Sequence, residues 1–121
     1  MNLRLDRESI RVRLSVDDLF TLAKDGQVSE RFPLPGGKTL GLRVERCLES
    51  RLKLNIEDDC FYLFIPAESV DRLVSAVGNP VEKSALELRE EFPDFKIQFE
   101  VDRFELKKNV RQMQRRGTSG S

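Results

Sequence analysis

Residues 9–26, Ser-Ile-Arg-Val-Arg-Leu-Ser-Val-Asp-Asp-Leu-Phe-Thr-Leu-Ala-Lys-Asp-Gly, join a strand pattern to a helix pattern without a break. The first half alternates apolar side chains with arginines, which indicates a strand with one buried and one wet face. Ser15 is suited to cap the helix that follows, and Gly26 is the residue type favoured just after a helix end. This stretch therefore predicts a strand that leads directly into a helix at about 16–25.

The same alternation recurs on both sides of this segment and predicts further strands. Residues 60–65 are apolar on both faces, which is typical of a strand that is central or covered by a helix. Pro66 ends that strand and starts a second helix, whose apolar residues from Val70 to Val77 recur at helical spacing. The predicted strands lie at about 3–5, 10–14, 27–34, 40–44, 52–56, 60–65 and 95–101.

One segment, residues 84–92, fits two structures. Its Glu, Leu and Arg content favours a helix by propensity, whereas Leu86 and Leu88 would face inward from a strand. We favour the helix and keep the strand open. No internal repeat of useful length is evident. The sum is an α+β fold, a mostly antiparallel sheet of about six or seven strands with two or three helices packed on it.

The 121 residues are predicted to form a single domain at 1–105. A basic C-terminal helix or tail follows at 106–116, and a flexible end at 117–121 has the composition of a linker or an expression scar. No run approaches the ~20 apolar residues of a membrane span, and the charged N-terminus is unlike a secretory signal. Cys47 and Cys60 fit small buried hydrophobes better than a disulfide framework. We therefore expect a cytoplasmic protein without a membrane partner.

Catalytic residues are not evident in this sequence. It contains no histidine, which is the commonest general acid–base group and metal ligand. The acidic turn at 57–59 lacks the ligand spacing of a Ca²⁺ loop, and Gly36-Gly37 lacks the residues of a phosphate loop. The expectation is a protein that is not an enzyme, with no catalytic residues, no cofactor and no metal.

Two groups of basic residues are candidate anion- or nucleic-acid-binding sites. Arg4, Arg11 and Arg13 would share one wet strand face, where they could hold a phosphate or carboxylate or pair with Asp6, Glu8 or acids of an adjacent strand. The chain has 21 basic and 21 acidic residues, yet 103–116 carries six basic residues against one acid. That basic segment could bind polyanions, dock on the acidic body or remain solvated. Its candidate residues are Lys107, Lys108, Arg111, Arg115 and Arg116.

Several short motifs together resemble a known family. They are Met1-Asn-Leu-Arg-Leu, Ser9-Ile-Arg-Val-Arg-Leu-Ser, Asp18-Leu, Gly26-Gln-Val-Ser-Glu and Phe64-Ile-Pro-Ala. They resemble a family of short bacterial proteins classed as a domain of unknown function, over roughly the first seventy residues. The resemblance implies a small bacterial cytosolic protein, and brings no activity, cofactor or ligand with it.

Taken together, these features favour a non-catalytic protein-interaction or oligomerisation module. Its partner would be a second copy in a homodimer or an unidentified protein, bound at an exposed sheet edge or an apolar helix face. The alternative is an anion- or nucleic-acid-binding protein that uses the arginine-bearing strands and the basic C-terminal segment.

Overall fold

The computed structural model describes residues 1–79 and 83–102 of the chain. In these ranges eight strands and two α-helices form, together with two short 3₁₀ turns. In chain order they are β1 (Asn2–Leu5), β2 (Ser9–Ser15), α1 (Val16–Asp25), β3 (Gln27–Pro33), η1 (Pro35–Gly37), β4 (Thr39–Cys47), β5 (Lys53–Glu57), β6 (Cys60–Pro66), α2 (Ala67–Val77), η2 (Lys83–Leu86), β7 (Glu87–Phe92) and β8 (Phe95–Asp102).

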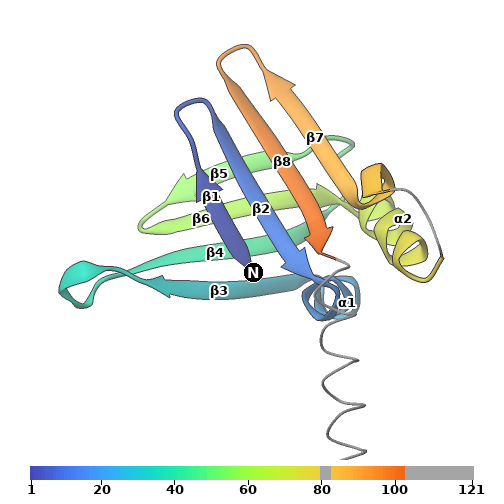
Figure 1. Ribbon diagram of the computed structural model, residues 1–121, viewed down its shortest axis with the longest axis horizontal. Coiled ribbons are helices and arrows are strands. Elements are labelled where there is room, and N and C mark those ends of the chain that lie inside the picture. The colour runs from blue at the N-terminus through green and yellow to red at the C-terminus, as the bar shows by residue number, and fades with distance from the viewer. Residues whose placement is uncertain (80–82, 103–121) are drawn as a thin grey trace, which may run out of the picture.

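The strands form two four-stranded sheets, which cross each other in Figure 1. We call the sheet of order β1-β2-β8-β7 sheet A and the sheet of order β3-β4-β6-β5 sheet B. In each sheet two antiparallel hairpins meet at a central parallel pair, β2 with β8 and β4 with β6. The predicted α+β class is confirmed, but the prediction of one mostly antiparallel sheet of six or seven strands is wrong. Alternation marks a strand without revealing its partner, and parallel partners lie far apart along the chain.

The helix that follows β2 confirms the prediction made from its caps. Asp18 N–H donates to Ser15 Oγ at 3.1 Å, and Ser15 N–H donates to an Asp18 carboxylate oxygen at 3.4 Å, which together form a capping box. At the other end Gly26 has φ +82°, a left-handed conformation that glycine adopts without strain. The predicted second helix is also present, as α2.

Residues 84–92 contain a strand, so the favoured helix was wrong. The short turn η2 leads into β7, which pairs antiparallel with β8 and places Leu88 opposite the buried Phe99. Leu86 is also buried, so the two leucines face the core while Glu87 and Arg89 alternate with them. Burial of apolar side chains against a neighbouring strand outweighs the weak helix propensity of the segment.

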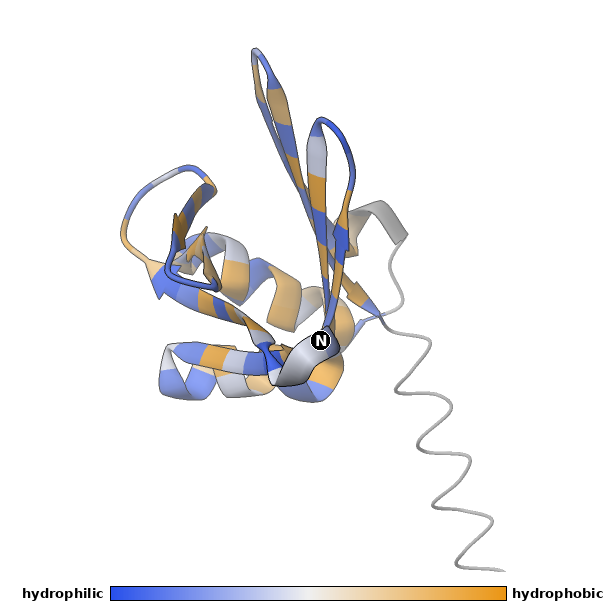
Figure 2. Cartoon of the chain, turned by 90° about the vertical axis from the view of Figure 1, so that its left-hand side faces the viewer, coloured by the Kyte–Doolittle hydropathy of each residue, from blue (hydrophilic) through white to orange (hydrophobic). Residues whose placement is uncertain are grey.

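The core lies where both helices pack on the two sheets. Helices α1 and α2 contact each other, and α1 also contacts strands of both sheets. In Figure 2 hydrophobic and hydrophilic bands alternate along the strands, as the sequence pattern predicts. The fully buried side chains come from both sheets and both helices, and include Val12, Leu14, Leu19, Leu22, Leu42, Val44, Leu63, Ile65, Leu73 and Phe99.

The two halves of the chain repeat the same ββαββ arrangement. The first half is β1-β2-α1-β3-β4 and the second is β5-β6-α2-β7-β8. Residues of β1, β2 and α1 correspond to residues 51 positions later, as in Asn2 with Lys53, Ser9 with Cys60 and Val16 with Ala67. The pairing registers agree as well: Arg4 faces Arg11 in the first half, and Asn55 faces Tyr62 in the second.

The correspondence continues through the remaining strands, and it exchanges sheet A with sheet B. Gln27 faces Glu45 in the first half just as Glu87 faces Glu100 in the second. Each half contributes one hairpin to each sheet, so the halves are intertwined. The structure therefore contains a repeat, whereas the sequence shows none of useful length. Identities are too few to reveal it, since between 2–25 and 53–76 only Leu3 and Leu22 recur, as Leu54 and Leu73.

Candidate functional site

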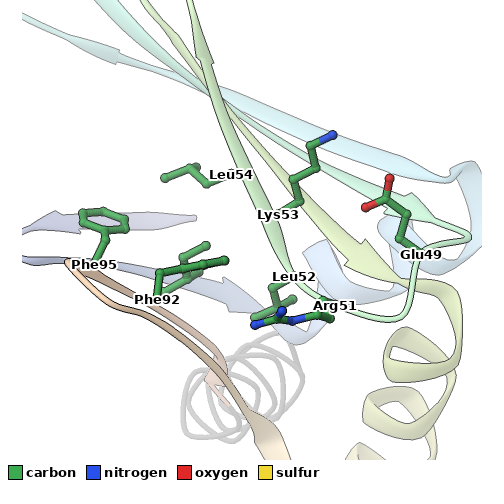
Figure 3. A pocket seen from close by; sticks show the side chains of 8 residues that line it. Glu49, Arg51, Leu52, Lys53, Leu54, Phe92 and Phe95 are labelled. Atoms are coloured by element: carbon green, nitrogen blue, oxygen red, sulfur yellow. The ribbon is translucent and has the colours of Figure 1, made fainter.

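An apolar groove lies between the two sheets, and we call it the inter-sheet groove (Figure 3). Its volume is about 410 Å³. Leu52 and Leu54 form the side that belongs to sheet B, and Phe92, Phe95 and Ile97 of the β7–β8 hairpin form the side that belongs to sheet A. Three charged residues complete the lining: Glu49 and Arg51 of the loop between β4 and β5, and Lys53 at the start of β5.

Arg51 links the two sides of this groove. Its guanidinium lies 3.1 Å from a carboxylate oxygen of Glu90 and 5.6 Å from the ring centroid of Phe92, both on β7. The hydrogen bond from Arg51 lowers the pKa of Glu90. The first half has the equivalent link, because the N-terminal ammonium of Met1 lies 2.9 Å from Glu30, the counterpart of Glu90. Each link joins the edges of the two sheets.

Exposed apolar side chains occur in the groove lining and in the chain segments next to it in sequence. Leu48, in the loop that leads to Glu49, is 100% exposed. Phe92 of the groove lining is 38% exposed, and Ile56 of the neighbouring β5 is 63% exposed. Full exposure of a leucine leaves about 1.5–3 kcal/mol of burial free energy unused. The groove is not evident from the sequence, because Leu52 and Phe95 are predicted only as members of strands whose neighbours the sequence does not reveal.

The three arginines of the first two strands lie together, as their alternation predicts. Arg4 of β1 is directly opposite Arg11 of β2, and Arg13 lies two residues further along the same face. They line a cavity of about 240 Å³ with Asn2 and Leu3. We call this surface the arginine face. It is on the outer side of sheet A, whose inner side carries the buried residues of β2.

A buried carboxylate holds two of these arginines. Glu100 of β8 is 7% exposed, and its oxygens lie 2.9 Å from Arg11 Nη2 and 2.5 Å from Arg13 Nε. Burial acts to raise the pKa of Glu100, but the hydrogen bonds from both arginines outweigh it and leave the pKa lowered. The sequence analysis expected a pairing with Asp6, Glu8 or an adjacent strand. Only the last is found, because the parallel neighbour of β2 comes from the far end of the domain.

Other candidates contribute less. The basic residues Lys107, Lys108, Arg111, Arg115 and Arg116 lie outside the described residues, as does the rest of 106–121. Cys47 and Cys60 are free thiols, but both are half-buried rather than the buried hydrophobes predicted. In 1–79 and 83–102, no group of three or more His, Cys, Asp or Glu side chains could hold a metal ion. No helix of these ranges is long and apolar enough to cross a membrane.

Fold and site together define a duplicated α+β domain with two mixed sheets, an apolar groove between them and an arginine face outside. A family model described as a family of unknown function, DUF7009, matches residues 1–91. The chain therefore belongs to this family, in agreement with the resemblance of its N-terminal motifs to a domain of unknown function. The matched residues extend from β1 to the penultimate residue of β7. No curated protein and no solved structure matches the chain.

Proposed function

We propose that this protein is a non-catalytic interaction module that forms a homodimer through the inter-sheet groove. The observation that carries the proposal is the fully exposed Leu48, which directly precedes Glu49 in the lining of an apolar groove of about 410 Å³. A projecting leucine next in sequence to the lining of an apolar hollow suits the association of two copies of the chain. In a twofold dimer each copy then places its Leu48 in the groove of the other, as an isologous interface requires.

The lining of the groove supports a leucine as its occupant. Leu54 and Phe95 provide apolar contacts, and the polar groups lie at the margin, where Arg51 is already paired with Glu90. Such a centre with a charged rim is typical of protein interfaces. The non-catalytic part of the proposal is supported by the absence of histidine from the whole sequence.

The test is the mass of the protein as a function of concentration, measured by sedimentation equilibrium. We expect a monomer–dimer equilibrium that Leu48→Ser weakens. Each dimer buries two copies of Leu48, at about 1.5–3 kcal/mol each, so the dissociation constant should rise about 100-fold or more. The matched control is Leu34→Ser, because Leu34 is 42% exposed and lies before the start of β4, whereas Leu48 follows its end.

Two results would refute the proposal. One is a wild-type protein that stays monomeric at the highest concentration reached. The other is a dimer that Leu48→Ser and Leu34→Ser weaken equally, since the interface would then lie elsewhere.

A further inference from the structure

The duplication of the fold provides an internal comparison for the arginine face. The positions of Arg4, Arg11 and Arg13 correspond to Asn55, Tyr62 and Phe64 on the outer side of sheet B. The pairing registers around these positions agree residue by residue. The same backbone arrangement thus forms in this chain without any arginine at these three places, so the fold does not require them.

The arginines also destabilise the sheet at these positions. Arg4 and Arg11 are a directly opposed cross-strand pair, and like charges in that position destabilise a sheet. The need to pair Glu100 of the neighbouring strand β8 does not explain three arginines. Its counterpart in sheet B, Glu45, pairs with Arg43 at 2.8 Å while the position opposite it in β6 is Phe64. A local cost that the fold does not demand is typical of a functional site.

The geometry leaves most of the arginine donors available. Arg11 uses Nη2 and Arg13 uses Nε to bind Glu100, while each guanidinium has five N–H donors. Within the described part of the chain, Arg4 makes no ion pair. Glu100 bonds two of the three arginines and fixes the orientation of their side chains, while Glu87 acts on Arg11 only through longer-range attraction. What remains is a concentration of guanidinium donors around a cavity of about 240 Å³.

We propose that the arginine face is a binding site for the phosphate group of a phosphorylated small molecule. A phosphate dianion is attracted by the three guanidiniums that line the cavity, and its oxygens can each accept from a guanidinium fork. Glu100 acts as a positioning residue, because it holds Arg11 and Arg13 beside the cavity and makes no contact with the phosphate. This site lies on the outer side of sheet A and is independent of the inter-sheet groove.

The probe is inorganic pyrophosphate, titrated at low ionic strength by calorimetry, with ¹⁵N-labelled protein to locate the affected amides. The main variant is Arg4→Asn, which copies the residue of the other half and so suits the strand. The matched control is Arg7→Asn, which removes the same charge from the β1–β2 turn outside the cavity. Loss of charge-assisted hydrogen bonds should weaken pyrophosphate binding about tenfold or more in Arg4→Asn. Arg7→Asn should change it less than about twofold.

Three results would overturn the proposal. Pyrophosphate that does not saturate the wild-type protein shows that no site exists. Equal weakening by Arg4→Asn and Arg7→Asn shows general charge attraction in place of a site. A single-stranded DNA oligonucleotide that binds more tightly than pyrophosphate, and equally well to Arg4→Asn, would assign anion binding to another, polymer-specific surface. Amide shifts confined to 2–15 and 96–102 would support the site.

Discussion

Glu100→Gln should destabilise the domain more than any other single replacement of a charged side chain on the outer side of sheet A. Glu100 is 7% exposed and accepts hydrogen bonds from Arg11 and Arg13. Glutamine has the same shape but offers one acceptor oxygen, and its amide group would face one of the arginines. One hydrogen bond is thus lost and the other changes from charge-assisted to a weaker form with a neutral acceptor.

The magnitude follows from these two bonds and from the exposure of the arginines. Hydrogen bonds to charged groups contribute about 1.5–3 kcal/mol each. The side chains of Arg11 and Arg13 are 35% and 40% exposed, so water replaces part of what glutamine cannot supply. We therefore take the lower end of that range and expect a loss of about 2 kcal/mol in the free energy of unfolding. For a domain of this size, that lowers Tm by roughly 8 °C.

Urea denaturation followed by circular dichroism measures this loss, with Glu87→Gln as the matched control. Glu87 is opposite Glu100 on β7 and pairs at 3.5 Å with Arg89, which is largely exposed. Its replacement should change the free energy of unfolding by less than about 0.5 kcal/mol. If Glu100→Gln were as mild as Glu87→Gln, the buried carboxylate would not hold the arginines as we infer.

The pH dependence gives a second check on the same reasoning. The pKa of Glu100 is lowered in the folded state. Its contribution to stability is therefore complete above the pKa of the unfolded state and is lost as pH falls through the lower folded pKa. The difference between wild type and Glu100→Gln should be largest near neutral pH and should shrink in acid. A difference that persists undiminished in acid would contradict the ionic origin of the stabilisation.

Further outcomes concern three places in the fold. Ser15→Ala removes the capping box of α1 and should cost about 1 kcal/mol in urea denaturation; no loss would mean that the cap is redundant. Gly41→Ala places a Cβ 2.9 Å from Cys60 Sγ and should cost about 1–3 kcal/mol, of which Cys60→Ala should recover a part; additive costs would contradict this contact. Burial acts to lower the pKa of the Met1 ammonium, but its bonds to Glu30 and Asp18 outweigh burial and raise that pKa. The contribution of the ammonium to the free energy of unfolding is therefore complete below about pH 8, and it is lost as pH rises through the folded pKa. Acetylation of the N-terminus should remove that alkaline loss, and an unchanged pH profile would refute it.

Local features of this fold are predictable from sequence, and its pairings are not. Ser15 and Gly26 mark both ends of α1, and their signals act within one helical turn. Glu100, by contrast, belongs to a strand whose alternation reveals nothing of its parallel neighbour, some 85 residues earlier in the chain. The arginine face was therefore predictable as three residues on one side of a strand, while the carboxylate that holds two of them was not.

The duplication was hidden for a related reason. Core positions constrain hydrophobicity and volume rather than identity, so Val12 and Leu63 or Leu14 and Ile65 serve equally well at corresponding places. A search by residue identity misses such a repeat, whereas the pairing registers display it at once. The groove depends on the same information, because its two sides come from hairpins of different sheets.

The intertwining of the two halves also decides when this protein can fold. Strand β2 occupies residues 9–15 and pairs with residues 96–102 of its central partner β8. Sheet A therefore closes only after nearly the whole described chain has left the ribosome, whereas all four strands of sheet B, from 27 to 66, are available much earlier. Pairings of such long sequence separation slow folding, because closing a large loop costs entropy before any stabilising contact forms. During synthesis the β1–β2 hairpin must wait with the β2 edge that pairs with β8 left open, and a chain that stops before β8 keeps that edge unpaired.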